Sequence, residues 1–487
     1  MVDLLYRSGA VNTTLWACCG AFLFVLVMRY RRGPSTEPAA TLIQPLLSSW
    51  AFLVALAVGT GVNVGYGIYK GYVVPRDYMQ DVFSAQSFID GGSLFPPDIG
   101  RKWVAWVENH PPAYSIWPAG SSRRQQEIEG RQNAAESDWV QAHPPLMGLF
   151  FVPLVRFFGV YGTYFAITVI SVSSLILSLV LIQHELRGPN ALVIATSLFL
   201  LILGWDAIVA VLRSGQSGVY LSLLLILGWI GARRGHNVAA GLCIGLATCL
   251  KVYPVLTLIL ALVRRFRMFL AAAATILLLT GATLALCGSN LLFDYARTTR
   301  YVTETYIPYA TNFSLMAAAN RLGEAMQWLI GKEGSMLLAA GFEACFGIGF
   351  VLFLSGRAFL TRGREDRSLR SFDLEYALTV AAMPLLSLVS WDHYKAVLLL
   401  PLAILGQQVF HHEARKGLAS VLCYLCLLAV LAIPEWTISM AAEQVAKLSP
   451  HLAKAGIMNI TTIGLLVLNG WLVREIVNAS SGPVVER

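Results

Sequence analysis

The chain has 487 residues, of which 56% are hydrophobic and only 13% are charged, and its formal net charge is +8. Soluble globular proteins carry about 25% charged residues, so this composition excludes a soluble enzyme, a disordered chain and, despite the positive charge, a nucleic-acid-binding protein. The apolar residues fall in blocks of about 17–25 residues, the length at which a helix crosses a hydrocarbon core. We therefore expect an all-α, polytopic helical membrane protein.

Basic residues near the ends of apolar segments mark the cytoplasmic side of a membrane protein. Such clusters lie at 29–32, 233–234, 264–267, 357–370 and 415–416. One threading of the chain places all of them inside, with the N-terminus outside and the C-terminus inside. Its first spans lie near 11–28, 47–69, 161–183, 189–206 and 216–232. We expect the whole chain to form a single domain, 1–487, of about 13 spans.

A long outer loop is expected from about residue 71 to residue 145. Tryptophans from Trp103 to Trp139 form aromatic islands between its polar stretches. This pattern is typical of helices that lie at the membrane interface. The loop is therefore predicted to carry interfacial helices on the outer face.

The segment 238–263 needs a special arrangement, because basic clusters flank it on both sides. It holds only about 26 residues, whereas two full spans need about 40. We expect two short helices that turn near Lys251 and Pro254, since proline lacks the N–H that would continue a helix. Irregular backbone at membrane depth is tolerated where it lines a wet cavity. Lys251 is therefore expected at the floor of an outward-facing cavity.

Two acidic residues follow the second expected span, in the stretch Pro75-Arg-Asp-Tyr-Met-Gln-Asp81. Asp77 could serve as a general base where a cavity meets the bilayer, or it could form an ordinary interfacial pair with Arg76. Asp81 lies one helical turn further on, so the two carboxylates could share a helix face. Either of them could take the catalytic role.

Two further polar residues are candidates for substrate binding. His143 begins His143-Pro-Pro145, ahead of the apolar stretch 146–158, which is too short to span and is expected to be an interfacial helix with proline at its start. The alternative for His143 is a role in the turn alone. Gln216 begins a span from the outer side and could bond a sugar hydroxyl or only cap the helix.

Three cations on the outer side could hold a phosphate. Lys251 in an apolar hairpin is costly unless a phosphate or an internal carboxylate offsets its charge. Arg297 and Arg300, three residues apart in another outer loop, could hold a phosphate on one helix face or contact lipid headgroups. Asn312 lies in the same loop and is a further candidate for substrate binding.

His393 lies in Trp391-Asp-His-Tyr-Lys395, at the outer end of an expected span. It could pair with a carboxylate and relay a proton, or the segment could belong to an aromatic belt. Acids, cations and a long loop therefore meet on one membrane face, which favours chemistry on a lipid-linked anionic substrate. A transporter would more often show paired repeats and polar residues at the midplane.

Six stretches together resemble the GT-C glycosyltransferases, and specifically glycosyltransferase family 87, the polyprenyl-phosphate-mannose-dependent type. They are Arg76-Asp77-Tyr-Met-Gln-Asp81, Ala142-His-Pro-Pro-Leu146, Ser214-Gly-Gln216, the run from Ala240 to Pro254, Asn312-Phe-Ser-Leu315 and Ser390-Trp-Asp-His-Tyr394. The early span near 11–28 and the long insert from about 100 to 140 depart from the family pattern.

The resemblance implies a GT-C-type bundle in a cell membrane, expected to be a bacterial inner membrane, with its active site on the extracytoplasmic side. It implies a polyprenyl-phosphate-linked sugar donor and a lipid or glycan acceptor, such as a cell-envelope glycolipid. Asp77 matches the family's general base, with Asp81 as the other candidate. His393 matches a late histidine that assists the base. Mannose is the expected sugar, and arabinofuranose stays open.

The chemistry of these residues agrees with that function. A carboxylate within about 3 Å could take the proton of an acceptor hydroxyl, and Lys251, Arg297 or Arg300 could stabilise the leaving phosphate. A single base without a nucleophilic partner predicts inversion. No acidic pair has the spacing of a nucleotide-diphosphate site, so neither a metal nor another cofactor is expected. A flippase or transporter of a lipid-linked sugar and a non-catalytic assembly protein stay open as alternatives.

Overall fold

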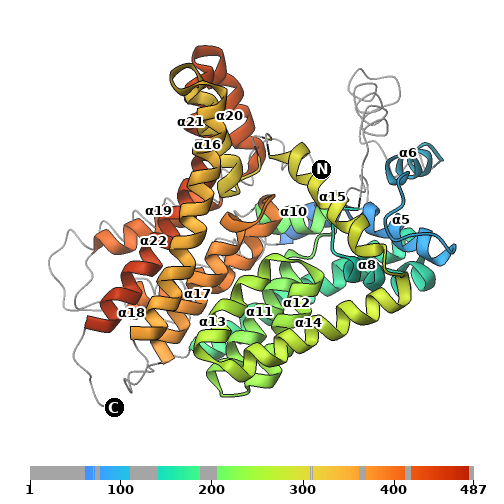
Figure 1. The fold of residues 1–487 in the computed structure, drawn as a ribbon, viewed down its shortest axis with the longest axis horizontal. Helices are drawn as coiled ribbons and strands as arrows, with labels where there is room; N and C mark the ends of the chain where they lie inside the picture. The colour runs from blue at the N-terminus through green and yellow to red at the C-terminus, as the bar shows by residue number, and fades with distance from the viewer. Residues whose placement is uncertain are drawn as a thin grey trace.

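The computed structural model describes residues 61–69, 71, 77–109, 141–186, 206–307, 309, 311–360, 369–411 and 418–481. Within these ranges the regular secondary structure is helical and no strand occurs (Figure 1). The span expected near 11–28, most of the one near 189–206 and the start of the one near 47–69 lie outside the described residues.

The helices follow the chain in this order, with η denoting 3₁₀ turns. The first are α5 (Tyr78–Ile89), α6 (Ile99–Asn109), α8 (Pro145–Leu186), α10 (Asp206–Ser214), α11 (Gly218–Arg233), α12 (Asn237–Leu250), η2 (Tyr253–Leu256), α13 (Thr257–Arg264) and α14 (Phe266–Cys287). The others are α15 (Leu291–Tyr306), α16 (Leu315–Leu360), α17 (Leu369–Leu386), η3 (Asp392–Leu398), α18 (Leu399–His411), α19 (Leu418–Leu431), α20 (Glu435–Leu448), α21 (Pro450–Ala455), η4 (Ile457–Asn459) and α22 (Ile460–Ser481).

Four described segments are long and apolar enough to cross a membrane. They are Pro145–Leu186, Phe266–Cys287, Ala340–Arg357 and Pro450–Ala479. α10 and α11 would add a fifth span if they count as one helix broken by a bend of 116°. These segments confirm an all-helical protein suited to several membrane crossings, while the total of about 13 spans stays a prediction.

The long helix α8 is interrupted at Gly159, whose φ of 65° lies in the left-handed region that only glycine adopts readily. The break falls between the two helices expected from the sequence, 146–158 and 161–183. Pro145 is the first residue of α8, where its fixed φ suits the helix and its missing N–H costs nothing. α5 packs against α8, and this contact holds the start of the outer loop in place.

The segment between Arg233 and Arg264 forms a hairpin of two short helices, of 14 and 8 residues, which turn at Lys251. Both ends of this hairpin meet the beginning of α17. Arg233 Nε lies 3.3 Å from Asp373 Oδ1, and Arg264 Nη2 lies 2.6 Å from Glu375 Oε1. The chain therefore enters and leaves the hairpin at the same end of the bundle. The cytoplasmic location of that end stays a prediction.

The hairpin is attached to α14, which runs beside α12 (Figure 1). A Cβ on Gly241 would lie 2.5 Å from the carbonyl oxygen of Met268, and one on Gly245 would lie 2.5 Å from Cβ of Thr275. The two glycines therefore allow the helix backbones to approach closely, as small residues do between membrane helices. The other face of α14 is uncovered, and Leu277 is 73% exposed.

Candidate active site

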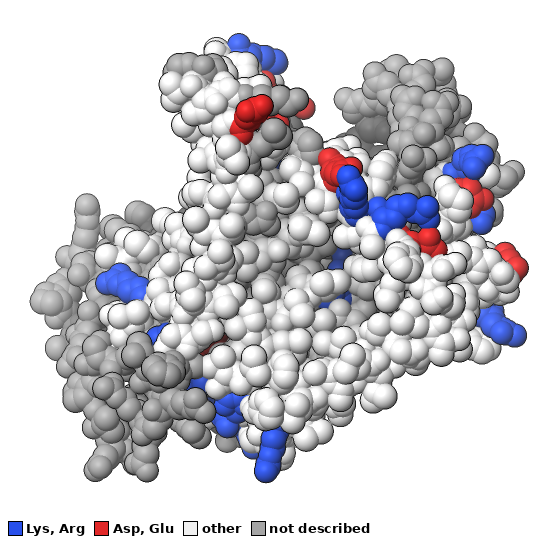
Figure 2. Space-filling model, in the orientation of Figure 1, with Lys and Arg blue, Asp and Glu red and all other residues white. Residues whose placement is uncertain are grey.

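A cavity of about 730 Å³ lies among the start of α5, the turn before α8, the α10–α11 turn, the α12–α13 hairpin, α15 and η3. This volume falls within the range of about 300–1,000 Å³ that is usual for small-molecule sites. Its charged and imidazole side chains are Asp77, His143, Arg213, Lys251, Asp392 and His393. Figure 2 shows basic side chains recessed in a hollow of the face toward the viewer. The site is thus a recess lined by two cations, two carboxylates and two imidazoles.

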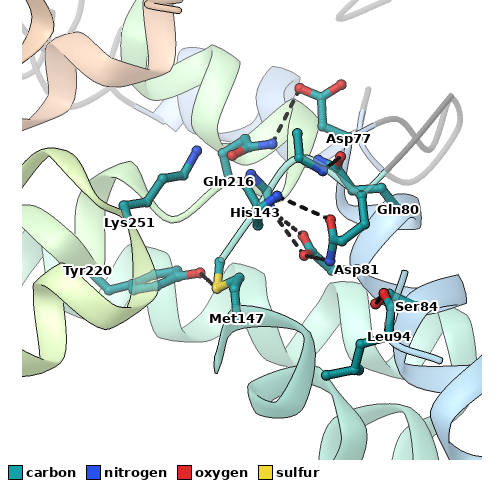
Figure 3. A network of polar contacts seen from close by, with 12 residues as sticks. Asp77, Gln80, Asp81, Ser84, Leu94, His143, Met147, Gln216, Tyr220 and Lys251 are labelled. Carbon is teal, nitrogen blue, oxygen red and sulfur yellow. Dashed lines mark hydrogen bonds and ion pairs between the residues drawn. The ribbon is translucent and has the colours of Figure 1, made fainter. Parts of the chain in front are cut away.

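Asp77 immediately precedes α5, and it lines the cavity. Its Oδ2 accepts a hydrogen bond from Gln216 Nε2 at 3.4 Å (Figure 3). Gln216 is 2% exposed and lies in the turn between α10 and α11. The contact joins two of the candidates that the sequence singled out, and it leaves the carboxylate at the cavity surface.

Two glycines make this contact possible. Gly215 has a φ of 61°, and a Cβ there would lie 2.7 Å from Cβ of Tyr78. A Cβ on Gly218 would overlap the carbonyl oxygen of His393. The left-handed backbone and the lack of space both exclude a larger residue at position 215. The beginning of α11 therefore packs tightly under the two segments that carry Asp77 and His393.

Asp81 occupies a different environment from Asp77. It is 1% exposed and lies behind the cavity wall. Both of its oxygens are 2.9 Å from His143 Nδ1, and Oδ1 also accepts a hydrogen bond from Gln141 Nε2 at 2.7 Å. Because a carboxylate can only accept, Nδ1 of His143 carries a proton and donates it in these hydrogen bonds. Asp81 thus fixes the orientation of His143, which lines the cavity.

Lys251 follows the last residue of α12 in extended backbone, with φ −146° and ψ 136°. Its Nζ lies 3.4 Å from the hydroxyl of Tyr394 and 4.8 Å from the centre of that ring. The side chain is only 6% exposed, and no carboxylate of the described residues pairs with it. Figure 3 shows it extending toward His143 and Gln216. A buried ammonium without a counter-ion is costly, so the position favours an anionic ligand.

The electrostatics of the cavity act on His393, which stands near the start of η3. Burial lowers the pKa of His393 well below its usual 6.5, and the positive charge of Lys251, His143 and Arg213 lowers it further. The imidazole is therefore neutral near pH 7. A neutral histidine can accept or donate a hydrogen bond, and the surrounding positive groups attract an anion.

The two arginines of α15 lie outside the cavity lining. Arg297 and Arg300 have side chains that are 80% and 81% exposed. Arg297 pairs with Asp294 at 2.6 Å and Arg300 with Glu304 at 2.8 Å, both on the same helix. Of these three candidate cations, therefore, only Lys251 lines the cavity.

Asn312 is fully buried and belongs to the support of the cavity wall. Its Oδ1 accepts hydrogen bonds from the backbone N–H groups of Ser314 and Ser390, at 3.1 and 3.0 Å. Its Nδ2 donates to the carbonyl oxygen of Tyr306 at 3.1 Å. Asn312 thus joins the α15–α16 connection to the segment before η3. Its side chain shapes the site from behind.

The sequence reasoning missed the neutral part of the cavity. This part is lined by Tyr253, by Tyr394 and by several residues of α15, which include Tyr295 and Tyr306. The sequence of α15 did contain a signal for this lining. Tyrosines and threonines recur there at helical spacing, on the face away from Arg297 and Arg300. Within the described residues, no group of three or more His, Cys, Asp and Glu side chains could hold a metal ion.

Comparison with known proteins gives the family. The model of glycosyltransferase family 87 matches residues 141–390, just over half of the chain. His143, Gln216, Lys251 and Asn312 lie within the match, whereas Asp77 precedes it and His393 follows it closely. Searches of curated proteins and of solved structures found no match. The family match, on a helical protein with a cavity that holds carboxylates and cations, shows that the chain belongs to glycosyltransferase family 87.

Proposed function

We propose that this membrane glycosyltransferase moves a sugar, expected to be mannose, from a polyprenyl-phosphate donor to a lipid or glycan acceptor. The observation that carries the proposal is one cavity with a carboxylate, Asp77, and a buried ammonium, Lys251, that has no carboxylate partner within the described residues. A phosphate in that cavity would supply the missing charge. Long apolar helices are suited to accommodating the lipid that bears it.

Asp77 is the general base in this proposal. An acceptor hydroxyl is a poor nucleophile near neutral pH, and it must lose its proton as its oxygen attacks the anomeric carbon. Asp77 lines the cavity and is held by Gln216, so its carboxylate can receive that proton. Asp81 is engaged by His143 and Gln141 behind the wall, which favours Asp77 over Asp81.

The leaving group is the lipid monophosphate. As the new glycosidic bond forms, the bond between the anomeric carbon and the phosphate oxygen breaks, and the phosphate gains a charge. Lys251 stabilises that charge, while His143 and the neutral His393 supply hydrogen bonds to the reacting groups. Attack from the face opposite the phosphate inverts the anomeric centre, so a β-linked donor gives an α-linked product.

The membrane arrangement belongs to the same proposal. We place the cavity on the extracytoplasmic side, and the basic ends at Arg233 and Arg264 in the cytoplasm. The complete bundle has about 13 spans, and the outer loop 71–145 holds interfacial helices. The ion pairs of Arg233 and Arg264 with the start of α17 support this arrangement, because they bring both ends of the hairpin to one side.

The test uses purified full-length protein with synthetic polyprenyl-phosphate mannose and a membrane glycolipid extract, and it reads the products by mass spectrometry. Asp77→Asn should abolish transfer because the amide keeps the shape of the side chain but cannot take the proton. Asp90→Asn, a change of an exposed acid at the end of the same helix, is the matched control. If Asp77→Asn turns over like the wild type, the assignment of the base is wrong.

A transporter of lipid-linked sugars remains the alternative function. It would carry the donor across vesicle membranes without forming a new glycosidic bond. Intact donor appearing on the far side, in the presence of every acceptor tried and without product, would favour transport over transfer.

A further inference from the structure

The cavity has a second, neutral wall that the transfer chemistry does not use. It consists of Tyr295, Thr299, Thr303, Tyr306, Tyr309 and Trp391, and we name it the aromatic wall. The first four residues share one face of α15. Arg297 and Arg300 lie on the exposed side of the same helix, so the charges of α15 face away from the cavity.

Three rings of this wall form a contiguous group. The ring centres of Tyr306 and Trp391 are 5.7 Å apart, those of Tyr309 and Trp391 are 6.1 Å apart, and those of Tyr306 and Tyr309 are 5.2 Å apart. All three pairs meet edge to face. Tyr309 is 50% exposed, and Trp391 and Tyr306 are partly exposed. Aromatic surface is thus presented to whatever enters the cavity.

Buried polar contacts hold this group in position. Arg321 is 2% exposed, and its Nη1 donates to the carbonyl oxygens of Tyr309 and Asn312, at 3.0 and 2.7 Å. Asn312 in turn binds the backbone of Tyr306 and Ser390, the residue before Trp391. Tryptophan and tyrosine that only anchor a protein at a membrane surface need no such support. These contacts fix the backbone that carries the three rings.

We infer that the aromatic wall is the acceptor subsite and that it binds an uncharged sugar ring of the acceptor. This inference rests on the proposed function. A sugar presents C–H groups on its faces and hydroxyls at its edge. The rings of Tyr306, Tyr309 and Trp391 match the faces, and the hydroxyls of Thr299 and Thr303 match the edge. The hydroxyl of Thr303 already donates to the carbonyl oxygen of Thr299 at 2.8 Å, so its oxygen is left to accept a hydrogen bond from the sugar.

The charge of the wall determines which sugars fit. The aromatic wall contains no charged side chain, and the nearby Asp392 is neutralised by Lys395 at 2.6 Å. An acidic or phosphorylated sugar would therefore be drawn to Lys251 and away from the wall. The donor phosphate and the acceptor sugar are thus separated by the chemistry of the two walls.

The test measures binding to the full-length protein without any donor. Saturation-transfer NMR would be recorded with neutral ligands, namely the methyl glycosides of mannose, glucose and arabinofuranose and an α-linked mannobiose. We expect at least one of them to bind. Trp391→Leu and Tyr309→Ala should each weaken that binding roughly 2- to 10-fold, the range expected for one stacked ring. Lys251→Met and the remote Trp471→Phe should leave it unchanged.

Three results would overturn the inference. They are the absence of binding for every neutral ligand, binding that survives both ring variants, and binding that is lost in Lys251→Met. Because Tyr309 is half exposed, Tyr309→Ala keeps the test readable if Trp391→Leu does not fold. A failure of sugar transfer would contradict the proposed function while this binding result stands on its own.

Discussion

The most informative perturbation is Lys251→Met, because stability and activity should respond in opposite directions. Methionine keeps an unbranched chain of similar length and removes the ammonium. In the structure this ammonium is 6% exposed, and its hydrogen bond to the hydroxyl of Tyr394 is long, at 3.4 Å. The ring of Tyr394, 4.8 Å away, adds a cation–π attraction, so folding recovers part of the cost of desolvating the charge.

The expected magnitudes follow from that environment. A lysine at the centre of a membrane helix costs about 2.5–3.5 kcal/mol, and a wet cavity reduces this cost, so Lys251→Met should be neutral or stabilising by up to about 2 kcal/mol. The contact of the ammonium with the phosphate is a charged hydrogen bond worth about 1.5–3 kcal/mol. Its loss should slow transfer roughly 10- to 150-fold, since about 1.4 kcal/mol corresponds to a factor of ten.

The assay pairs thermal unfolding of the purified protein, followed by tryptophan fluorescence, with the rate of sugar transfer. Lys447→Met is the matched control, because Lys447 is exposed and donates a hydrogen bond to Gln444 on the same helix, α20. An unfolding midpoint that falls by several degrees while the transfer rate stays near that of the wild type would refute the reasoning. Lys251 would then be a structural residue.

Three further predictions concern the packing and protonation of the site. Gly218→Ala should cost about 1–3 kcal/mol of stability and slow transfer, because its Cβ would overlap the carbonyl oxygen of His393. Gly470→Ala, where a Cβ meets open space, is the control and should do neither. Equal unfolding midpoints for the two variants would contradict this. Asp81→Asn should slow transfer no further when His143→Ala is already present, since Asp81 acts through the imidazole; additive losses would show an independent role. The pKa of His393 is well below 6.5, so the imidazole becomes protonated only at more acidic pH. His393→Gln should therefore slow transfer without changing the pH profile of the rate between about 6 and 8. A fall of the wild-type rate near pH 6.5 that disappears in this variant would refute the prediction.

The sequence predicted those features that depend on local chemistry and on spacing. Too few residues lie between the two basic clusters to form two full spans, which predicted a short hairpin around Lys251. The structure has two short helices that meet there. The break between the two parts of α8 followed from the length of its apolar stretch, and Gly159 occupies it. Both are properties of a segment considered by itself.

The roles of Asp77 and Asp81 could not be separated in that way. The sequence placed them one helical turn apart, so they could share a helix face and either could be the base. The structure turns Asp81 toward His143, a residue more than sixty positions away, and leaves Asp77 at the cavity. The contact with His143, which is distant in the sequence, gives Asp81 a different environment from that of Asp77. The spacing of Arg297 and Arg300 indicated that they share a face of α15. It could not indicate which face of that helix meets the cavity, and Arg297 lies on the exposed one.

The close packing of α12 on α14 links the site to the thickness of the surrounding lipid. α14 is a candidate span whose outer face is uncovered, so its tilt must adjust when the hydrocarbon layer becomes thicker or thinner. Through Gly241 and Gly245 it is in rigid contact with the hairpin that ends at Lys251. A change in tilt therefore moves the ammonium relative to Asp77, which is attached to α5. Vesicles of short-chain and long-chain phospholipids should consequently give different transfer rates at equal protein and donor, with an optimum at one chain length.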